Sequence, residues 1–328
     1  MDTFVEIKGI KGVFVYGDKV LIKCETSGGE LSFSVPIINF PYFAYIIQEA
    51  KEKIKDLNPL PNLKIQDEIS LLNIYLTYAI PHKILGDEKT FRKKMKEIFE
   101  FQKNQGLINR ITIVQSILDK LSKPRTYLEI GVERGFTFYQ IQAEKKIAVD
   151  PEFKIPGGFK NTESEIFFQL TSDEFFENYA EDFGEDPFDV ILIDGLHTFE
   201  QSRRDVENSL KFLSSRGVIV MHDCLPKSYP SSLKSLADAV KHPEFDGSWS
   251  GDVYKTIIYL RAKRKDLFVA VVDSDHGVGI VKYGEPENMI DIEEDKIEQI
   301  DFFELMKRKE ELLNIKPPDW FKIWIEKL

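Results

Sequence analysis

Acidic and imidazole side chains follow short apolar runs at four places in the chain. Glu129 lies within the run TYLEI, and Asp150 and Asp194 close the runs IAV and DVILI. His222 and Asp223 directly follow a fourth run, GVIVM. In an open sheet of parallel strands, ligands bind outside the carboxyl ends of the strands. We therefore expect these side chains to meet at one edge of a sheet, where they can bind a ligand or take part in proton transfer.

A glycine turn joins the first of these runs to the second. The segment YLEIGVERGFTFYQIQAEKKIAVD predicts a buried strand, a tight turn between Gly131 and Gly135, a helix beginning over residues 136–142, and a second strand that ends at Asp150. Asp150 lies 150 − 131 = 19 residues after the first glycine. This is close to the roughly 20-residue offset of a ribose-binding carboxylate in a βαβ nucleotide fold. We expect Asp150 to accept hydrogen bonds from ribose hydroxyls, with both glycines allowing close backbone approach.

The charges around the turn narrow the class of ligand. A dinucleotide site has the pattern G-x-G-x-x-G, because backbone amides must close around a pyrophosphate. Here the pattern is Glu129-x-Gly131-x-x-x-Gly135, and Glu133 adds a further negative charge. Carboxylates would repel a diphosphate, and they suit a ligand with a positive centre and no phosphate. S-adenosylmethionine is such a ligand, so the pattern favours a methyl donor over NAD, with Glu129 at the methionine end.

Strands and helices alternate along the rest of this region. Strands are expected at residues 165–170, 189–193 and 217–221, and helices at residues 172–179 and 199–213. Such alternation predicts an α/β fold with a mostly parallel sheet and right-handed crossovers. Two further apolar runs flank DSDHG (273–277), which we interpret as a hairpin turn that gives the sheet an antiparallel edge strand. The long connector 225–250 is typical of an active-site cap.

The two ends of the chain differ from this central region. Residues 4–38 predict an antiparallel β-meander, residues 42–57 a helix, and residues 68–80 an apolar element of ambiguous type. Helices are expected over residues 87–105 and 108–121. A chain of 328 residues exceeds the usual size of one domain. We expect a small N-terminal α+β domain at 1–106 that caps the site or mediates oligomerisation, a ligand-binding domain at 107–285, and a C-terminal helical tail at 286–328.

The central region resembles a class I S-adenosylmethionine-dependent methyltransferase and is similar to the small-molecule O-methyltransferases of antibiotic and sugar pathways. The likeness covers about half of the chain and is carried by LEIGVERG (128–135), AVDP (148–151), TSDEFF (171–176), FDVILIDGLHTFEQSRRDVENSLKFL (188–213), GVIVMHDCLP (217–226) and GDVYKTIIYLR (251–261). It implies a Rossmann-like fold with a seven-stranded sheet, S-adenosyl-L-methionine as methyl donor, and a small hydroxylated acceptor such as a sugar or polyketide.

The resemblance also implies a role for residues after the third strand. Ser172 and Asp173 would contact the adenine, with Asp173 accepting from the exocyclic amine. A structural role fits equally well, because Thr171 or Ser172 can cap a helix that has Glu174 in its first turn.

Asp194 and Asp223 end neighbouring strands and are candidate ligands of Mg²⁺, which prefers a few carboxylates plus water. In the catechol-type enzymes a following Asn completes this pair. Cys224 takes that place here, and a thiol is a poor magnesium ligand, so a metal requirement stays open. Asp194 has an alternative role in orienting the donor or a histidine.

Methyl transfer to a hydroxyl requires removal of a proton, for which an imidazole is well suited at neutral pH. His197, three residues after Asp194, is the first candidate for the general base. His222 is the second candidate and an alternative metal ligand. Near the expected rim, Trp249 and Asp252 lie in WSGDVYK, a segment that either contacts the acceptor or caps a helix.

Composition excludes several classes of protein. The net charge is −11 and no basic stripe occurs, which argues against a nucleic-acid partner. Two cysteines provide no disulfide framework, and no apolar run reaches the ~18 residues of a membrane span. The N-terminus MDTFVEIKG does not resemble a signal peptide, so we expect a cytoplasmic protein.

Two alternatives remain beside a methyltransferase. One is a scaffold that binds S-adenosylmethionine without turnover, and the other is an NAD-dependent oxidoreductase, which the missing G-x-G-x-x-G pattern disfavours.

Overall fold

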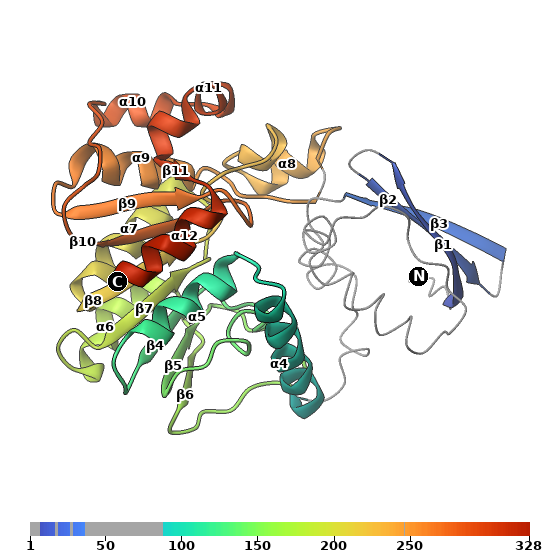
Figure 1. The fold of residues 1–328 in the computed structure, drawn as a ribbon, viewed down its shortest axis with the longest axis horizontal. Helices are drawn as coiled ribbons and strands as arrows, with labels where there is room; N and C mark the ends of the chain where they lie inside the picture. The colour runs from blue at the N-terminus through green and yellow to red at the C-terminus, as the bar shows by residue number, and fades with distance from the viewer. Residues whose placement is uncertain (1–6, 17–18, 27–28, 37–87, 246) are drawn as a thin grey trace. The chain divides into compact units, whose positions relative to one another are not determined.

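The computed structural model describes residues 7–16, 19–26, 29–36, 88–245 and 247–328, and it divides into two compact units, Met1–Gly86 and Asp87–Leu328. In the first unit, β1 (Ile7–Tyr16), β2 (Lys19–Thr26) and β3 (Gly29–Pro36) pair in an antiparallel meander, as the sequence predicts (Figure 1). The helix expected at 42–57 and the element expected at 68–80 lie outside the described residues.

An eight-stranded sheet forms the second unit, in the order β11-β9-β10-β8-β7-β4-β5-β6. The strands are β4 (Thr126–Ile130), β5 (Lys145–Val149), β6 (Glu165–Phe168), β7 (Phe188–Ile193), β8 (Leu213–Met221), β9 (Leu267–Val272), β10 (Val278–Tyr283) and β11 (Ile315–Lys316). β10 runs antiparallel to both β8 and β9, and the remaining pairs are parallel. The expected Rossmann-like sheet of seven strands is confirmed, with two corrections. The short β11 adds an eighth strand, and the antiparallel strand lies inside the sheet because β9 and β11 continue beyond it.

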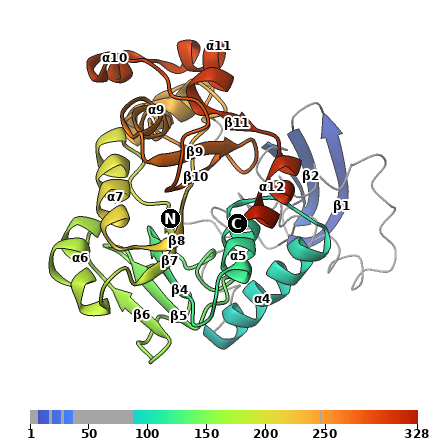
Figure 2. The same cartoon turned by 60° about the vertical axis from the view of Figure 1, so that its left-hand side comes forward.

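Helices cover both faces of this sheet, which explains why its central strands are apolar on both faces. Helix α5 (Arg110–Lys120) packs on β7 and β8 from one side. Helix α7 (Phe199–Lys211) packs on the same two strands and also contacts α6 (Ser172–Asn178) and α9 (Tyr254–Lys263). Figure 2 shows α5 on one side of the sheet and α6 and α7 on the other. The sheet core is therefore closed to solvent on both faces, and its open edge carries the site.

The segment after the glycine turn is not the helix that the sequence predicts. Residues 136–140 form successive turns, with Tyr139 N donating to Gly135 O at 3.0 Å and Gln140 N to Thr137 O at 2.9 Å. Phe138 and Tyr139 are both buried, and the Phe138 ring lies 5.2 Å from that of Phe167. Two adjacent residues, Phe138 and Tyr139, are both packed in the core, and this packing favours turns over a regular helix in this segment.

The unit boundary falls after Gly86, 20 residues before the expected one at 106. Helix α4 (Glu88–Asn104) packs on α5 and belongs to the second unit. The C-terminal segment also belongs there, because α10 (Glu294–Gln299) and α11 (Phe302–Leu313) pack on α9, and α12 (Pro318–Trp324) packs on β9. The expected tail at 286–328 is thus an integral part of this unit.

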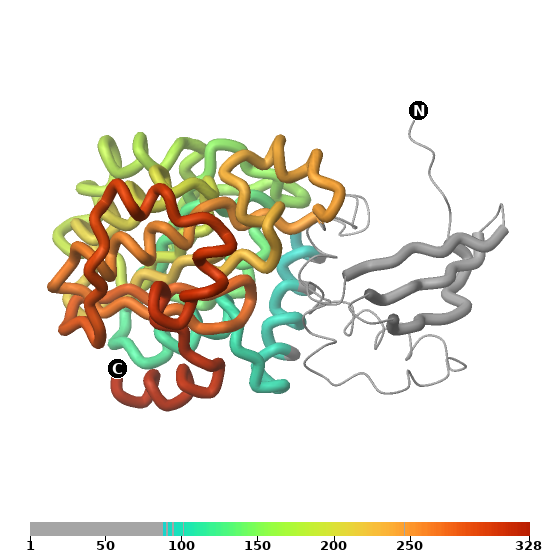
Figure 3. The backbone as a smooth tube through the Cα atoms, turned by 90° about the horizontal axis from the view of Figure 1, so that it is seen from above, coloured from blue at the N-terminus to red at the C-terminus, as the bar shows by residue number. Residues whose placement is uncertain are grey.

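The long connector 225–250 contains a short 3₁₀ turn, η3 (Pro230–Ser232), and α8 (Leu236–Lys241), and it is gold in Figures 1 and 3. The backbone N–H groups of Ser250 and Gly251 donate to Ser231 O at 3.0 and 2.9 Å, which closes the connector on itself. This closure returns Trp249 and Ser250 to the edge of the sheet. Among the described residues, no helix combines the length and apolar character needed to cross a bilayer.

Candidate functional site

Three adjacent strands end together at the open edge of the sheet. β4, β7 and β8 are neighbours, and the ladder continues one residue beyond each strand end. Asp194 N donates to Ile130 O at 2.8 Å, and His222 N donates to Ile193 O at 3.0 Å. The residues that follow these strands are therefore brought side by side, as the sequence predicts for the carboxyl ends of parallel strands.

Gly131 is required by the close approach of two of these strand ends. Its φ is +84°, and a Cβ at this position would overlap the backbone carbonyl of Asp194. Any other residue would push the turn after β4 away from the end of β7.

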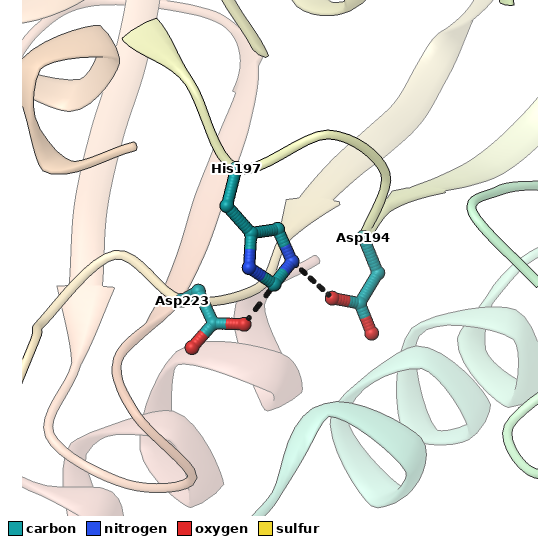
Figure 4. A group of neighbouring side chains, drawn as sticks. All are labelled: Asp194, His197 and Asp223. Atoms are coloured by element: carbon teal, nitrogen blue, oxygen red, sulfur yellow. Dashed lines mark ion pairs between the residues drawn. The ribbon is translucent and has the colours of Figure 1, made fainter. Parts of the chain in front are cut away.

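Two carboxylates and one imidazole converge at the ends of β7 and β8 (Figure 4). His197 Nε2 lies 3.5 Å from Asp194 Oδ1 and 3.4 Å from Asp223 Oδ2. The three ligand atoms all lie within 4.8 Å of one another, a spacing that suits one metal ion. Asp223 is buried, whereas Asp194 and His197 are partly exposed. The structure thus brings together the two predicted metal ligands and the predicted general base.

The orientation of His197 is fixed by the connector. Its Nδ1 lies 2.7 Å from the backbone carbonyl of Trp249, and a carbonyl oxygen can only accept, so Nδ1 carries the proton. The other nitrogen, Nε2, then presents a lone pair to the two carboxylates. Gly251 has φ +58°, and a Cβ there would overlap the carbonyl of His197. Glycine at this position therefore lets the connector come close enough to hold the ring.

His222 has a different role from His197. Its Nδ1 lies 3.1 Å from Asp194 Oδ1 and 2.9 Å from Asp223 Oδ2, and therefore donates to the same two carboxylates. Its Nε2 lies 3.0 Å from Arg110 Nη1, which can only donate, so this contact is a hydrogen bond in the neutral ring. Burial and Arg110 lower the pKa of His222, but Asp223, Asp194 and Asp275 outweigh them and raise it well above the usual value. With no ion present, Nδ1 of His222 lies within donating distance of the two carboxylates, and its predicted roles as a second base or a metal ligand stay predictions.

Arg110 and Asp275 complete the site, and sequence reasoning missed both. Arg110 Nη1 donates to Asp275 Oδ1 at 3.2 Å and Oδ2 at 3.0 Å, and Arg110 Nε lies 3.5 Å from Asp194 Oδ2. The backbone N–H of Arg110 also donates to Asp275 Oδ2 at 3.1 Å. Asp275 lies in the DSDHG hairpin between β9 and β10, with φ +46°. The hairpin interpretation is confirmed, but it gave no indication that Asp275 also contacts Arg110.

Charges in the cluster shift one another's protonation. Burial raises the pKa of Asp194, but His222, His197 and Arg110 lower it well below the usual value. Burial lowers the pKa of His197, and Asp223 and Asp194 more than offset this and raise it above the usual value. Without a cation, the charged imidazole is thus the form that best neutralises the two carboxylates.

Glu129 lies deeper than this cluster. Its Oε2 accepts from Tyr127 Oη at 2.6 Å, and the residue is buried. Burial raises the pKa of Glu129 to about 8, although Tyr127 and Arg110 oppose the shift. Glu129 is therefore largely protonated at neutral pH, and a cationic group beside it would favour its ionised form.

Asp150 ends β5 as predicted, and its carboxylate binds the glycine turn. Oδ2 accepts from the backbone N–H groups of Val132 and Glu133, both at 2.8 Å, and Oδ1 accepts from Glu152 N at 2.7 Å. Gly135 bounds the same turn with φ +73°. The carboxylate thus holds the shape of the turn, and one lone-pair direction is left for a ligand hydroxyl.

The predicted adenine contacts are engaged with α7. Ser172 Oγ donates to Asp205 Oδ1 at 2.6 Å, and Asp173 Oδ2 pairs with Arg204 at 3.2 Å. Thr171 is the N-cap of α6 in a capping box with Glu174, as the structural alternative predicts. Two details lie outside the sequence-based expectations. Asp205 is buried, and its pKa is raised to about 6, mainly by burial.

Asp252 does not cap the helix that it precedes. Its Oδ1 accepts from Phe199 N at 2.7 Å, so it binds the first residue of α7 instead of α9. Cys224 is buried, and its Sγ lies 3.7 Å from Met221 O and 3.6 Å from His222 O. Burial raises the pKa of this thiol. Cys224 packs in the core and offers no ligand to the carboxylate pair.

The part of the chain that contains the converging cluster matches a known protein family. Residues 128–224 match the family described as "Methyltransferase domain". The matched stretch begins in β4 and ends just after Asp223, so it contains the glycine turn and the converging cluster. The matched region, with its sheet order and its cluster at the strand ends, is a class I methyltransferase domain.

Individual proteins are more distant. The search of curated proteins found no match. Among solved structures, cofactor-bound Rv0187 from MTB is 14% identical, with a TM-score of 0.41 and coverage of 69% of this chain and 100% of that one. SAH-bound PaMTH1 from Podospora anserina is 15% identical, with a TM-score of 0.41 and coverage of 59% and 88%. MycE of the mycinamycin biosynthetic pathway, in complex with Mg and SAH, is 17% identical, with a TM-score of 0.36 and coverage of 52% and 48%. The assignment rests on the family match and the sheet.

Proposed function

We propose that this protein is an S-adenosylmethionine-dependent methyltransferase that methylates a hydroxyl group of a small acceptor, such as a sugar or polyketide. The observation that carries the proposal is the convergence of Asp194, His197 and Asp223 inside the region that matches a methyltransferase domain. This cluster combines negative charge, which attracts a cationic donor, with a lone pair that can assist removal of the acceptor proton.

The glycine turn argues against the NAD-dependent alternative. The backbone N–H groups of Val132 and Glu133 donate to Asp150 and do not face an open phosphate pocket. No helix follows the turn at residues 136–140, so the helix N-terminus that usually binds a pyrophosphate is missing there. A donor without phosphates fits these contacts better.

Donor binding is assigned to the ends of β4, β5 and β6. Glu129 would accept from the ammonium of the methionine portion, Asp150 would accept from a ribose hydroxyl, and Ser172 and Asp173 would lie beside the adenine. Asp194 lies beside the end of β4, because its backbone N–H donates to Ile130 O at 2.8 Å. These roles follow from position at the strand ends and are the ones the sequence predicts.

S-adenosylmethionine, when bound, supplies a methyl group on a positively charged sulfur. The chain's own residues hold the two reactants in line, which is where most of the acceleration is expected. The lone pair of His197 Nε2 accepts the acceptor's proton or a cation that promotes its loss. His222 and Arg110 keep Asp194 oriented throughout.

The residues present also fit a divalent cation. Two carboxylate oxygens and one imidazole nitrogen face one point, a donor set used by protein metal sites. Asp194 and Asp223 would hold the ion, whose positive charge would favour the ionised form of the acceptor hydroxyl.

A labelled-methyl transfer assay tests the proposal. The full chain is incubated with S-adenosylmethionine carrying a labelled methyl group and a panel of small sugars, phenols and polyketides, with and without divalent ions. We expect label in at least one acceptor, lost in H197A and retained in H242A. His242 follows α8 and contacts Tyr229, away from the cluster, so it is a matched histidine control.

The rival scaffold function predicts a different outcome. Calorimetry would then show that the full chain binds S-adenosylhomocysteine, while no label is transferred to any acceptor in the panel. That result would replace the enzymatic proposal with a binding role.

A further inference from the structure

The converging cluster contains a nitrogen lone pair, and not only oxygens. Asp194 Oδ1 and Asp223 Oδ2 face the same point as His197 Nε2. Nδ1 of His197 donates to the carbonyl of Trp249, so Nε2 has no proton of its own in the neutral ring. In the neutral ring this lone pair faces two carboxylate oxygens at 3.4–3.5 Å, so all three atoms are acceptors. His222 Nδ1 contacts the two oxygens but not the lone pair, and a cation at the shared point would satisfy all three atoms.

The spacing of these atoms suits a single small ion. Ligand atoms about 2.0–2.2 Å from one metal ion lie roughly 3.0 Å apart at octahedral right angles and roughly 3.4 Å apart in a tetrahedron. His197 Nε2 lies 3.5 Å from Asp194 Oδ1 and 3.4 Å from Asp223 Oδ2. A small adjustment of the side chains would place one ion in contact with all three.

Each ligand is held by contacts on its far side. Ser250 Oγ donates to Asp223 Oδ1 at 2.6 Å, which leaves Oδ2 directed at the shared point. Arg110 Nε lies 3.5 Å from Asp194 Oδ2, which leaves Oδ1 directed there as well. The Trp249 carbonyl fixes His197 in the same way, and its ring lies 5.3 Å from the imidazole. Backbone carbonyls and hydrogen-bonded carboxylates of this kind orient the ligands in many metal sites.

The chemistry of the donor set determines which ions it prefers. Mg²⁺ prefers oxygen ligands, whereas imidazole nitrogen suits first-row transition ions. The residue after Asp223 offers no oxygen ligand, because it is Cys224, whose thiol is also buried in the core. His197, which follows β7, supplies the third atom in its place.

We propose that Asp194, Asp223 and His197 bind a divalent first-row transition ion, of the manganese, iron or cobalt type, in preference to Mg²⁺. The proposal rests on the proposed methyltransferase function and deepens it, because it makes His197 a metal ligand. The ion would lower the pKa of the acceptor hydroxyl beside it, and the proton would then pass to solvent water and not to His197.

Metal titration of the full chain tests this inference without turnover. Chelator-stripped protein is titrated with Mn²⁺ and followed by electron paramagnetic resonance, and Mg²⁺ affinity is measured by its competition. We expect Mn²⁺ to bind at least about 10-fold more tightly than Mg²⁺, in line with the ligand preferences above. Co²⁺ should give visible absorption bands whose position or intensity changes in H197A, as expected if His197 is a ligand.

Variants of His197 identify the third ligand. H197A should weaken Mn²⁺ binding at least about 10-fold, since even residues that only support a metal ligand are worth 10–100-fold in affinity. H197D, which offers oxygen in place of nitrogen, should shift the preference toward Mg²⁺. H242A should leave both affinities unchanged, and thermal melts check that each variant is folded.

Three outcomes would overturn the inference. They are equal or tighter binding of Mg²⁺, unchanged Mn²⁺ affinity in folded H197A, and no ion binding by wild-type protein. Parallel calorimetry with S-adenosylhomocysteine separates this result from the fate of the methyltransferase proposal. Donor binding without metal binding removes only the metal site, whereas metal binding without donor binding or methyl transfer removes the proposed function.

Discussion

The acids at the two halves of the sheet edge are neutralised in different ways. At the ends of β5 and β6, Asp150 accepts three backbone N–H groups and Asp173 pairs with Arg204. At the ends of β7 and β8, Asp194 and Asp223 face one another with two imidazoles between them. The first half uses its acids to shape a turn that a neutral part of a ligand can contact. The second half gathers charge at one point, an arrangement that is stable only with a proton or a metal ion there.

Asp223→Asn should produce the largest effect on activity, because it removes one negative charge from the cluster at the ends of β7 and β8. Asn tolerates the left-handed backbone of this position, at φ +59°, so the fold should be kept. We expect kcat for methyl transfer to fall on the order of 10³-fold. Affinity for S-adenosylhomocysteine, measured by calorimetry, should stay within about threefold. A large loss of donor affinity would show that the ends of β7 and β8 also bind the donor, contrary to this division of roles.

Arg110→Met tests whether the charged cluster needs its cation. Arg110 contacts Asp275 and Asp194 directly, and loss of one partner of a buried pair costs about 3–5 kcal/mol. The free energy of unfolding, measured with denaturant, should fall by about 3 kcal/mol. The double variant R110M/D275N should recover part of that loss, because it removes both charges of the pair. An additive double variant would mean that the two residues act separately.

Asp150→Ala perturbs the other half. Three backbone donors lose their acceptor, and the turn after β4 loses its shape. We expect donor affinity to fall by about 100-fold, which is close to 3 kcal/mol, with intact binding of Mn²⁺. Asp150→Asn, which keeps an acceptor oxygen, should lose less. Equal donor affinity in wild type and D150A would remove the ribose assignment.

Glu129 makes a smaller contribution, to the pH dependence of the free energy of unfolding. The pKa of Glu129 in the folded chain is about 8, above its usual value of 4.5. Between these two pH values the folded chain keeps the proton on Glu129, whereas the unfolded chain has released it. The free energy of unfolding should therefore fall as pH rises from about 4.5 to about 8, and Glu129→Gln should lack this contribution.

The same residue predicts proton release on donor binding. At pH 7, a cationic donor group beside Glu129 should displace its proton, and donor affinity should rise with pH by at most about 10-fold per pH unit. Calorimetry in buffers of different ionisation enthalpy measures the protons released. Wild-type release that persists in E129Q would assign the proton to another group.

The sequence predicted the strand ends better than the contacts that complete them. Apolar runs closed by Asp194 and Asp223 placed both carboxylates at one edge, because parallel strands bring their carboxyl ends together. Arg110 and Asp275 could not be found in this way, because a residue at a helix start and one in a hairpin have their own local explanations. Their pairing depends on how α5 and the hairpin pack on the sheet.

Two local predictions failed for related reasons. A helix is expected to begin over residues 136–142, but residues 136–140 form turns in which Phe138 and Tyr139 are buried. Asp252 stands where a helix cap is expected, yet it binds the N–H of Phe199 in another helix. In both cases tertiary contacts outweigh a local preference of about 1 kcal/mol.

Calorimetric titration of the full chain with S-adenosylhomocysteine, followed by competition with NADH, tests the central claim most directly. We predict saturable binding of the nucleoside thioether that NADH does not displace. A chain that ignores S-adenosylhomocysteine, or that prefers the pyrophosphate compound, would contradict the assignment of this acidic strand edge to a methyl donor.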